Sequence, residues 1–457
     1  MMIERFISSY LPATPAPCKY DVYFDTASAL RTAAASAEWT DEVHQAMQFL
    51  SKRVEISKHL YESYHENGTK ASTTLLAGEL QPLALTLLFK DFCRLADDGK
   101  TACAVKRLNA VLKLLDSLAS GNIPVEPTLV NLIDVEAERF LTRLPHADTP
   151  PSKTLANTQA PVNAGTLPIT VLFWEGPIAR AYLATLKSMG LKPEKIIHLI
   201  SKNDLVSRKP IGRFLPGSLK LAYAHSRQKN SIHYWSTTIR KTESSLYQSI
   251  RNTVSDKLGF ADKDIDEALA LCDLSDYSLD VETLMIENLA DSALYERLLE
   301  LAQTKLLFTG GGIVPKRLLE ITTLKFIHLH PGHLPEVRGA DCVLWSYLMK
   351  GRTSATCFYM APGIDDGDVI LASYLPSLTP NLEVASMDVR TLYRATYAFL
   401  DPWVRSYVLR QALIETAGFT QVVACPQTED TSVTYHFMHD RIKRIALAQL
   451  FAEPLPH

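Results

Sequence analysis

The stretch FIHLHPGHLPEVRGA, residues 326–340, carries the densest cluster of polar side chains in the sequence. It opens with a short apolar run that predicts a strand. Alternation along that strand places His328 and His330 on the same face, at its carboxyl end. Two imidazoles in this position can exchange protons with a single reacting centre. We therefore expect a catalytic site where this strand ends.

A carboxylate-rich turn follows at residues 361–370, with the sequence APGIDDGDVI, and leads into another β run. A buried carboxylate beside an imidazole fixes the tautomer of the ring and stabilises its charged form. Asp366 and Asp368 are more typical of turn formation, because Asp readily bonds its own backbone there. The sequence thus provides a histidine cluster and a carboxylate that could serve it.

The region around these motifs alternates between short β-rich runs and helical runs. The expected strands are 169–174, 195–201, 282–286, 305–308 and 326–329, with helices near 178–190 and 291–303. This alternation predicts an α/β fold with an open, mostly parallel sheet. Ligands bind such sheets at the carboxyl ends of the strands.

We expect four parts along the chain. They are an all-α N-terminal domain of unknown role at 1–144, a linker at 145–167, a catalytic domain at 168–380, and a C-terminal helical extension with a small terminal unit at 381–457. Apolar residues at three- and four-residue spacing predict the N-terminal helices, such as 84–96 and 102–118. Thr128 is a candidate to open the last of them, which runs to Leu141. Four prolines and the loss of periodicity mark the linker.

The bulk composition is that of a soluble globular protein. The 457 residues carry 47 Lys+Arg and 50 Asp+Glu, so the net charge of −3 indicates no chain-wide preference for nucleic acid or membranes. The cysteines are scattered without metal-binding spacing, and the N-terminus has no apolar signal segment. We expect a cytoplasmic protein with reduced thiols and no bound metal.

One segment departs from this balance, because residues 202–241 hold nine Lys/Arg and a single acidic residue, Asp204. Aromatic residues such as Tyr223 and Trp235 are interleaved with the basic ones. A basic insertion of this kind could hold an anionic substrate or its phosphates. The alternative is a solvated loop whose charge is balanced by the acidic stretch 256–300.

The region from about 168 to 417 is similar to the 10-formyltetrahydrofolate-dependent formyltransferase family, which includes methionyl-tRNA, glycinamide ribonucleotide and sugar N-formyltransferases. The matching motifs are His-Pro-x-x-Leu-Pro at 330–335, Arg338-Gly339-Ala340, Trp345, and Gly-Ile-Asp-Asp-Gly-Asp-Val-Ile at 363–370. Segments 286–291 and 306–316 also occupy the places of family segments. The first 150 or so residues match nothing in the family.

The resemblance implies roles for individual residues. His330 would be the catalytic histidine and Asp365 its partner, while His333 and Arg338 would face the substrate. The loops that hold the pterin of 10-formyltetrahydrofolate would include Gly311, Gly312, Ile313, Val314, Ala361, Gly363 and Ile364.

The chain departs from the family at His328, where the family carries an asparagine whose amide donates to the formyl oxygen. Such a donor contributes roughly 3–4 kcal/mol. An imidazole can also donate there, but it is larger and titrates near neutrality. Our hypothesis is attack by an amine on the formyl carbon, with His328 and His330 stabilising the oxygen. Asp365 would relay the proton to the departing folate nitrogen.

The sequence therefore predicts an N-formyltransferase acting on an amine of a small molecule, either an amino sugar or an amino-acid-derived biosynthetic intermediate. A tRNA acceptor is not expected, because the region after 380 looks short and helical, whereas tRNA-specific members carry a basic barrel. The N-terminal domain could support a homodimer or contact a carrier protein.

Three alternatives remain open at this point. One is a formyltetrahydrofolate hydrolase, and another is a non-catalytic scaffold with a degenerate domain. The third is a metal-dependent hydrolase using His328, His330 and His333, although Gly332 stands where such sites usually carry an acidic residue.

Overall fold

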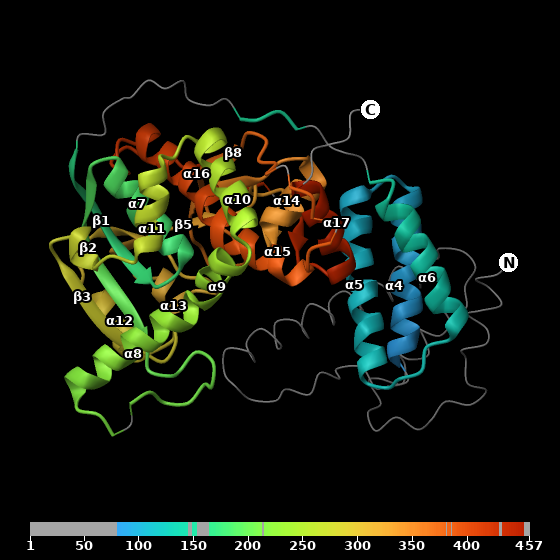
Figure 1. Cartoon of the computed structure of the whole chain (residues 1–457), viewed down its shortest axis with the longest axis horizontal. Coiled ribbons are helices and arrows are strands. Elements are labelled where there is room, and N and C mark those ends of the chain that lie inside the picture. The colour runs from blue at the N-terminus through green and yellow to red at the C-terminus, as the bar shows by residue number, and fades with distance from the viewer. Residues whose placement is uncertain are drawn as a thin grey trace. The chain divides into compact units, whose positions relative to one another are not determined.

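The computed structural model describes residues 80–144, 149–152 and 164–451, except 213, 381, 385 and 429–431. The chain forms two compact units, which divide after Pro145. Figure 1 shows both units, with their helices and strands labelled where there is room. In the described residues no helix is both long and apolar enough to cross a membrane.

The described part of the first unit consists of three helices, α4 (Leu80–Asp97), α5 (Thr101–Ser120) and α6 (Pro127–Leu141). The helical pattern expected for 84–96 and 102–118 is present, whereas residues 1–79 of the expected N-terminal domain lie outside the described residues. Helix α6 begins one residue before the expected Thr128, because Pro127 occupies the first helical position, where the proline φ suits a helix and no N–H is needed.

The second unit is built on a seven-stranded sheet in the order β3-β2-β1-β4-β5-β7-β8. The strands are β1 (Gly165–Trp174), β2 (Leu191–Ser201), β3 (Val281–Ile286), β4 (Thr304–Phe308), β5 (Leu324–His330), β7 (Ser354–Tyr359) and β8 (Val369–Tyr374). Strands β3, β2, β1, β4 and β5 are parallel, while β7 and β8 run antiparallel at one edge. The expected open, mostly parallel sheet is confirmed.

Helices cover both faces of this sheet. On one face, Leu172 and Phe308 pack with Leu294 of α12 (Ser292–Leu299) and Leu318 of α13 (Lys316–Leu319). Because side chains alternate along a strand, Phe173 points to the opposite face. There it lies under the guanidinium of Arg180, which belongs to α7 (Pro177–Ser188). The apolar runs that were predicted to be strands are therefore buried on both faces of the sheet.

The segment between the two units is shorter in the structure than the linker expected at 145–167. Strand β1 starts at Gly165, so the last residues assigned to the linker belong to the sheet. Residues 149–152 lie along the sheet edge, where the Ser152 N–H donates to the Tyr374 carbonyl at 2.9 Å. The Ser152 hydroxyl in turn accepts from the Tyr374 N–H at 2.9 Å. These bonds cover part of an edge strand that would otherwise expose unpaired backbone.

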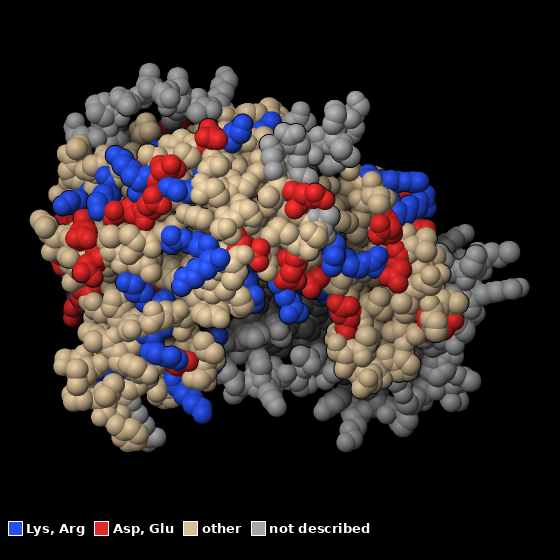
Figure 2. Space-filling view, in the orientation of Figure 1, with Lys and Arg blue, Asp and Glu red and all other residues tan. Residues whose placement is uncertain are grey.

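The basic insertion is largely helical. It forms α8 (Gly217–Ile232) and α9 (Tyr234–Thr242) rather than an extended loop. Lys202 pairs with Asp291 at 2.7 Å, and Arg227 pairs with Asp204 at 2.8 Å. On the face shown in Figure 2, acidic and basic side chains are interspersed. Part of the positive charge is therefore neutralised within the chain, and Asp291 comes from the acidic stretch expected to balance it.

Helices and a short strand pair complete the second unit. They are α10 (Ser244–Leu258), α11 (Asp262–Ala270), α14 (Cys342–Lys350), α15 (Val389–Ala395), α16 (Asp401–Glu415), α17 (Asp440–Phe451), and the pair β6 (Arg338–Gly339) and β9 (Thr434–Tyr435). A π-helical turn, Thr396–Leu400, joins α15 to α16. The pairing of β6 with β9 brings the C-terminal segment against the expected site.

Candidate active site

His330 is the last residue of β5 and is 2% exposed. Its Nδ1 lies 3.2 Å from Oδ1 of Asp365, and its Nε2 lies 2.9 Å from the carbonyl oxygen of Val337. Both partners are oxygen acceptors, so a singly protonated ring could satisfy only one of them. The arrangement is complete when both ring nitrogens carry a proton.

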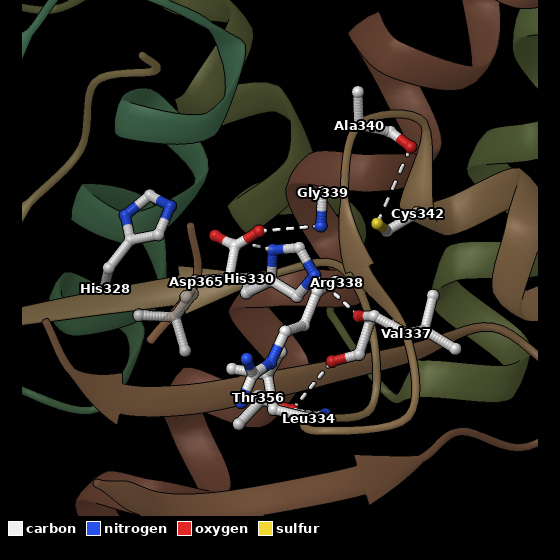
Figure 3. Close-up of polar contacts among 12 residues, drawn as sticks. His328, His330, Leu334, Val337, Arg338, Gly339, Ala340, Cys342, Thr356 and Asp365 are labelled. Atoms are coloured by element: carbon white, nitrogen blue, oxygen red, sulfur yellow. Dashed lines mark hydrogen bonds and ion pairs between the residues drawn. The ribbon is translucent and has the colours of Figure 1, made fainter. Parts of the chain in front are cut away.

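Asp365 sits in the loop between β7 and β8, in a left-handed backbone conformation with φ 49°. Its Oδ2 accepts from the Gly339 N–H at 2.8 Å (Figure 3). Burial alone would raise the pKa of this carboxyl, but His330 and the Gly339 N–H outweigh that effect and lower the pKa to about 2. Asp365 is therefore a carboxylate at neutral pH, as its expected partnership with His330 requires.

Gly367 gives the Asp365 loop its tight form. Its φ is 118°, and a Cβ at this position would lie 2.0 Å from the Tyr359 carbonyl oxygen. No side chain fits there, so the loop can fold back on β7 only with glycine. This close approach turns the carboxylate of Asp365 toward the end of β5.

His328 lies on the same strand as His330, as expected, and is partly exposed. Its Nδ1 lies 3.2 Å from the carbonyl oxygen of Phe308, the last residue of β4. Burial, followed by the positive charge of Arg405, lowers the pKa of His328 to about 4. The ring is neutral at neutral pH, and its single proton belongs on Nδ1, because a carbonyl can only accept.

Arg405 of α16 contacts the strand that carries both histidines and was not found from the sequence. Its Nη1 donates to the Leu329 carbonyl at 2.7 Å, between the two histidines. Its Nε and Nη2 bond the fully buried carboxylate of Asp401 at 2.9 Å and 3.0 Å. The buried ion pair fixes the backbone that carries both imidazoles. Only the i, i+4 spacing of Asp401 and Arg405 was visible in the sequence.

Gln427, also missed, ties the C-terminal segment to the site. Its Oε1 accepts from Arg338 Nη2 at 2.8 Å, while its Nε2 donates to the carbonyls of Asp365 and Gly367 at 3.0 Å and 2.7 Å. Arg338 is thus engaged with the protein, as a brace for the Asp365 loop. No local motif marks Gln427, which lies 62 residues after Asp365.

His333 is separated from the other two histidines by its packing. Its ring stacks on Tyr374 with centroids 4.3 Å apart and an interplanar angle of 7°. Among the described residues, no group of three or more His, Cys, Asp or Glu side chains is placed to hold a metal ion. The three histidines therefore do not converge as the metal-hydrolase alternative required.

The two loops expected to hold 10-formyltetrahydrofolate differ in how exposed their residues are. Gly311, Gly312 and Ile313 are exposed after β4, whereas Val314 packs into the core beside that strand. In the other loop Gly363 is exposed and Ala361 and Ile364 are half-buried. The backbone amides and carbonyls of residues 310–314 make no bond to the described protein. They are free to pair with the polar edge of a flat ligand.

Comparison with known proteins gives partial matches. No protein-family model matches the chain. The methionyl-tRNA formyltransferase of Syntrophus aciditrophicus is 32% identical over 101 residues, which is 22% of this chain and 32% of the relative. That of Clostridioides difficile is 42% identical over 62 residues, or 13% of this chain and 20% of the relative. The chain thus spans about a third or less of these relatives.

Among solved structures, the chain is similar to an N-formyltransferase from Helicobacter canadensis in complex with folinic acid and dTDP-3-aminofucose. The TM-score is 0.34 at 12% identity, covering 62% of this chain and 80% of the other. The resemblance of this chain to the formyltransferase family, indicated by its motifs, is confirmed by the curated relatives over part of its length.

Proposed function

We propose that this chain transfers a formyl group from 10-formyltetrahydrofolate to an amine of a small molecule. The observation that carries the proposal is the His330–Asp365 ion pair at the carboxyl end of β5, with His328 beside it. This is where an open parallel sheet binds ligands. The curated relatives are formyltransferases, which agrees with the same chemistry.

The donor loops support a reduced folate as the formyl carrier. The unpaired peptide groups of 310–314 suit the donor and acceptor edge of a pterin, and Ile313, 48% exposed, offers an apolar contact for its ring. When bound, the folate supplies an activated formyl carbon. The residues of this chain hold that carbon beside the histidines and supply the charge and the proton movements.

His330 and Asp365 act as a unit in this proposal. The carboxylate of Asp365 holds the imidazole through Nδ1, and the Val337 carbonyl holds it through Nε2. With a proton on both nitrogens, the ring presents positive charge at a constant position. Preorganised charge of this kind stabilises an oxygen that becomes negative during acyl transfer.

The acceptor we propose is an amino sugar or an amino-acid-derived intermediate rather than tRNA. After residue 380, the described chain is dominated by the helices α15, α16 and α17. These form no barrel of the kind that tRNA-specific enzymes carry. The exposed Lys209 of the basic insertion could contact phosphates of a nucleotide-linked sugar.

The test is a transfer assay with 10-formyltetrahydrofolate and three probe amines: dTDP-3-aminofucose, free glucosamine and lysine. We expect wild type to formylate at least one, and His330→Ala and Asp365→Asn to lose 100-fold or more in kcat, in line with the roughly 10²–10⁴-fold contributions of such groups. Asp366→Asn and His225→Asn are matched controls outside the ion pair. Wild-type turnover by either site variant would contradict the assignment.

A further inference from the structure

The two histidines of β5 differ in which ring nitrogen is available to a ligand. His330 has none, because Nδ1 and Nε2 both face protein oxygens at hydrogen-bond distance. His328 is bonded only through Nδ1, to the Phe308 carbonyl. Its Nε2 has no hydrogen-bond partner among the described residues, and the side chain is partly exposed.

The contact with the Phe308 carbonyl determines whether Nε2 of His328 can donate or accept a hydrogen bond. A carbonyl oxygen has lone pairs and no proton, so the contact requires a proton on Nδ1 of His328. A neutral imidazole carries a single proton, which leaves a lone pair on Nε2. The free nitrogen therefore accepts a hydrogen bond or a proton, and it cannot donate to a developing oxyanion, the role expected from the asparagine that it replaces.

We propose that His328 is the general base of the transfer, receiving through Nε2 the proton that the acceptor amine loses, while His330 supplies only positive charge. This inference rests on the proposed function. It gives the two rings separate roles, proton acceptance for His328 and charge stabilisation for His330. It assigns His328 a role that asparagine, which has no basic lone pair, could not perform.

The proton balance closes on His328 alone. The amine lone pair forms a bond to the formyl carbon, and one amine proton passes to Nε2 of His328. The bond between that carbon and the folate N10 breaks, its electron pair stays on N10, and the proton on Nε2 passes to that nitrogen. The products are the formamide and tetrahydrofolate, and His328 returns to its neutral form.

The charged groups around His328 agree with a proton held only briefly. Arg405 of α16 and His330 of β5 lower the pKa of the ring in addition to burial, while Asp365 of the β7–β8 loop and the hydrogen bond to Phe308 raise it. The net effect is a weak base whose protonated form is a strong acid. The amine becomes more acidic as its new bond forms, and N10 must gain a proton as its bond to carbon breaks, so a base that holds the proton only briefly can pass it from one nitrogen to the other.

Two substitutions separate the base role from oxyanion donation. His328→Asn keeps a donor near the Nδ1 position and restores the residue typical of the family, and His328→Gln places an amide near the Nε2 position. We expect kcat to fall roughly 100-fold or more in both, within the range for loss of a general base. Folate-analogue binding and thermal melting of each variant establish that it is folded. Wild-type activity in His328→Asn would overturn the proposal.

Chemical rescue provides the second readout. In His328→Ala, added imidazole should restore part of the rate in proportion to its unprotonated form. Because the wild-type to variant ratio cancels the titration of the amine itself, that ratio should fall as the pH drops below about 5. A ratio that rises on acidification, or a folded His328→Ala without rescue, would show a cationic donor instead. If wild type formylates no probe amine, the proposed function itself fails, which is a distinct result.

Discussion

At the residue scale, Asp365 connects the backbone geometry of the site to its charge. A non-glycine residue at φ 49° is uncommon, and Asp and Asn tolerate that conformation best. The conformation aims one carboxylate at two donors, His330 and the Gly339 N–H. The substitution Asp365→Asn therefore removes the charge while keeping the backbone.

Asp365→Asn should destabilise the protein in a pH-dependent way. The folded-state pKa of Asp365 lies below its ordinary value of 3.8, at about 2, so its stabilisation is complete above about pH 4 and is lost as the pH falls toward 2. We expect a loss of about 2 kcal/mol in the free energy of unfolding at pH 7, by denaturant titration. The gap to wild type should close on acidification. A gap that stays constant down to pH 2 would contradict the ion pair.

The resemblance to the formyltransferase family implied the pairing of His330 with Asp365. Strand alternation, a local property, placed His328 on the same face as His330. The sequence was insufficient to predict the tautomer of His328. That depends on the Phe308 carbonyl, 20 residues away on a neighbouring strand. The engagement of Arg338 by Gln427 likewise depends on a long-range contact with no local signal.

At the element scale, the site depends on how β5 meets its neighbours. Phe308 ends β4, His330 ends β5, and β7 runs antiparallel to β5 so that His330 pairs with Thr356. Periodicity predicted the parallel strands, since buried runs between helices are distinctive. Periodicity did not predict β7, because that strand is defined by its pairing with the strands on either side. The helices α8 and α9 were also missed, because charge and aromatic residues obscure their weakly apolar faces.

Gln427 offers a test at this scale, because one side chain joins the C-terminal segment to the Asp365 loop. Gln427→Ala removes the bonds to Arg338, Asp365 and Gly367, which should cost about 1–3 kcal/mol of stability. We expect faster amide hydrogen exchange across residues 361–368 and a lower kcat. Gln421→Ala, an exposed glutamine in the same segment, is the control. Equal exchange in the two variants would show that Gln427 is not a brace.

At the scale of the whole molecule, the chain divides into two compact units, and the proposed chemistry lies in the second. We propose that the proline-rich segment that begins at residue 145 links them. The segment 149–152 nevertheless belongs with the second unit, since Ser152 pairs with Tyr374 at the edge of β8.

Two truncations test this organisation. A chain starting at Thr149 should unfold cooperatively and keep formyl transfer, because it retains the bonds to Tyr374. A chain starting at residue 164 should melt roughly 5 °C lower, if the lost edge bonds contribute about 2 kcal/mol. Calorimetry on both truncated chains would measure this difference in melting temperature. Equal melting temperatures would show that 149–152 contributes nothing to the sheet, and an inactive 149–457 chain would show that the first unit is needed for the chemistry.

The central claim, formyl transfer to an amine, is tested most directly by following an isotope-labelled formyl group from 10-formyltetrahydrofolate. We predict that the label appears in the formamide of a probe amine and that turnover requires the amine. We also predict that Asp365→Asn slows this transfer about 100-fold or more. Release of the label as formate at the same rate without any amine would contradict the account and identify a hydrolase instead.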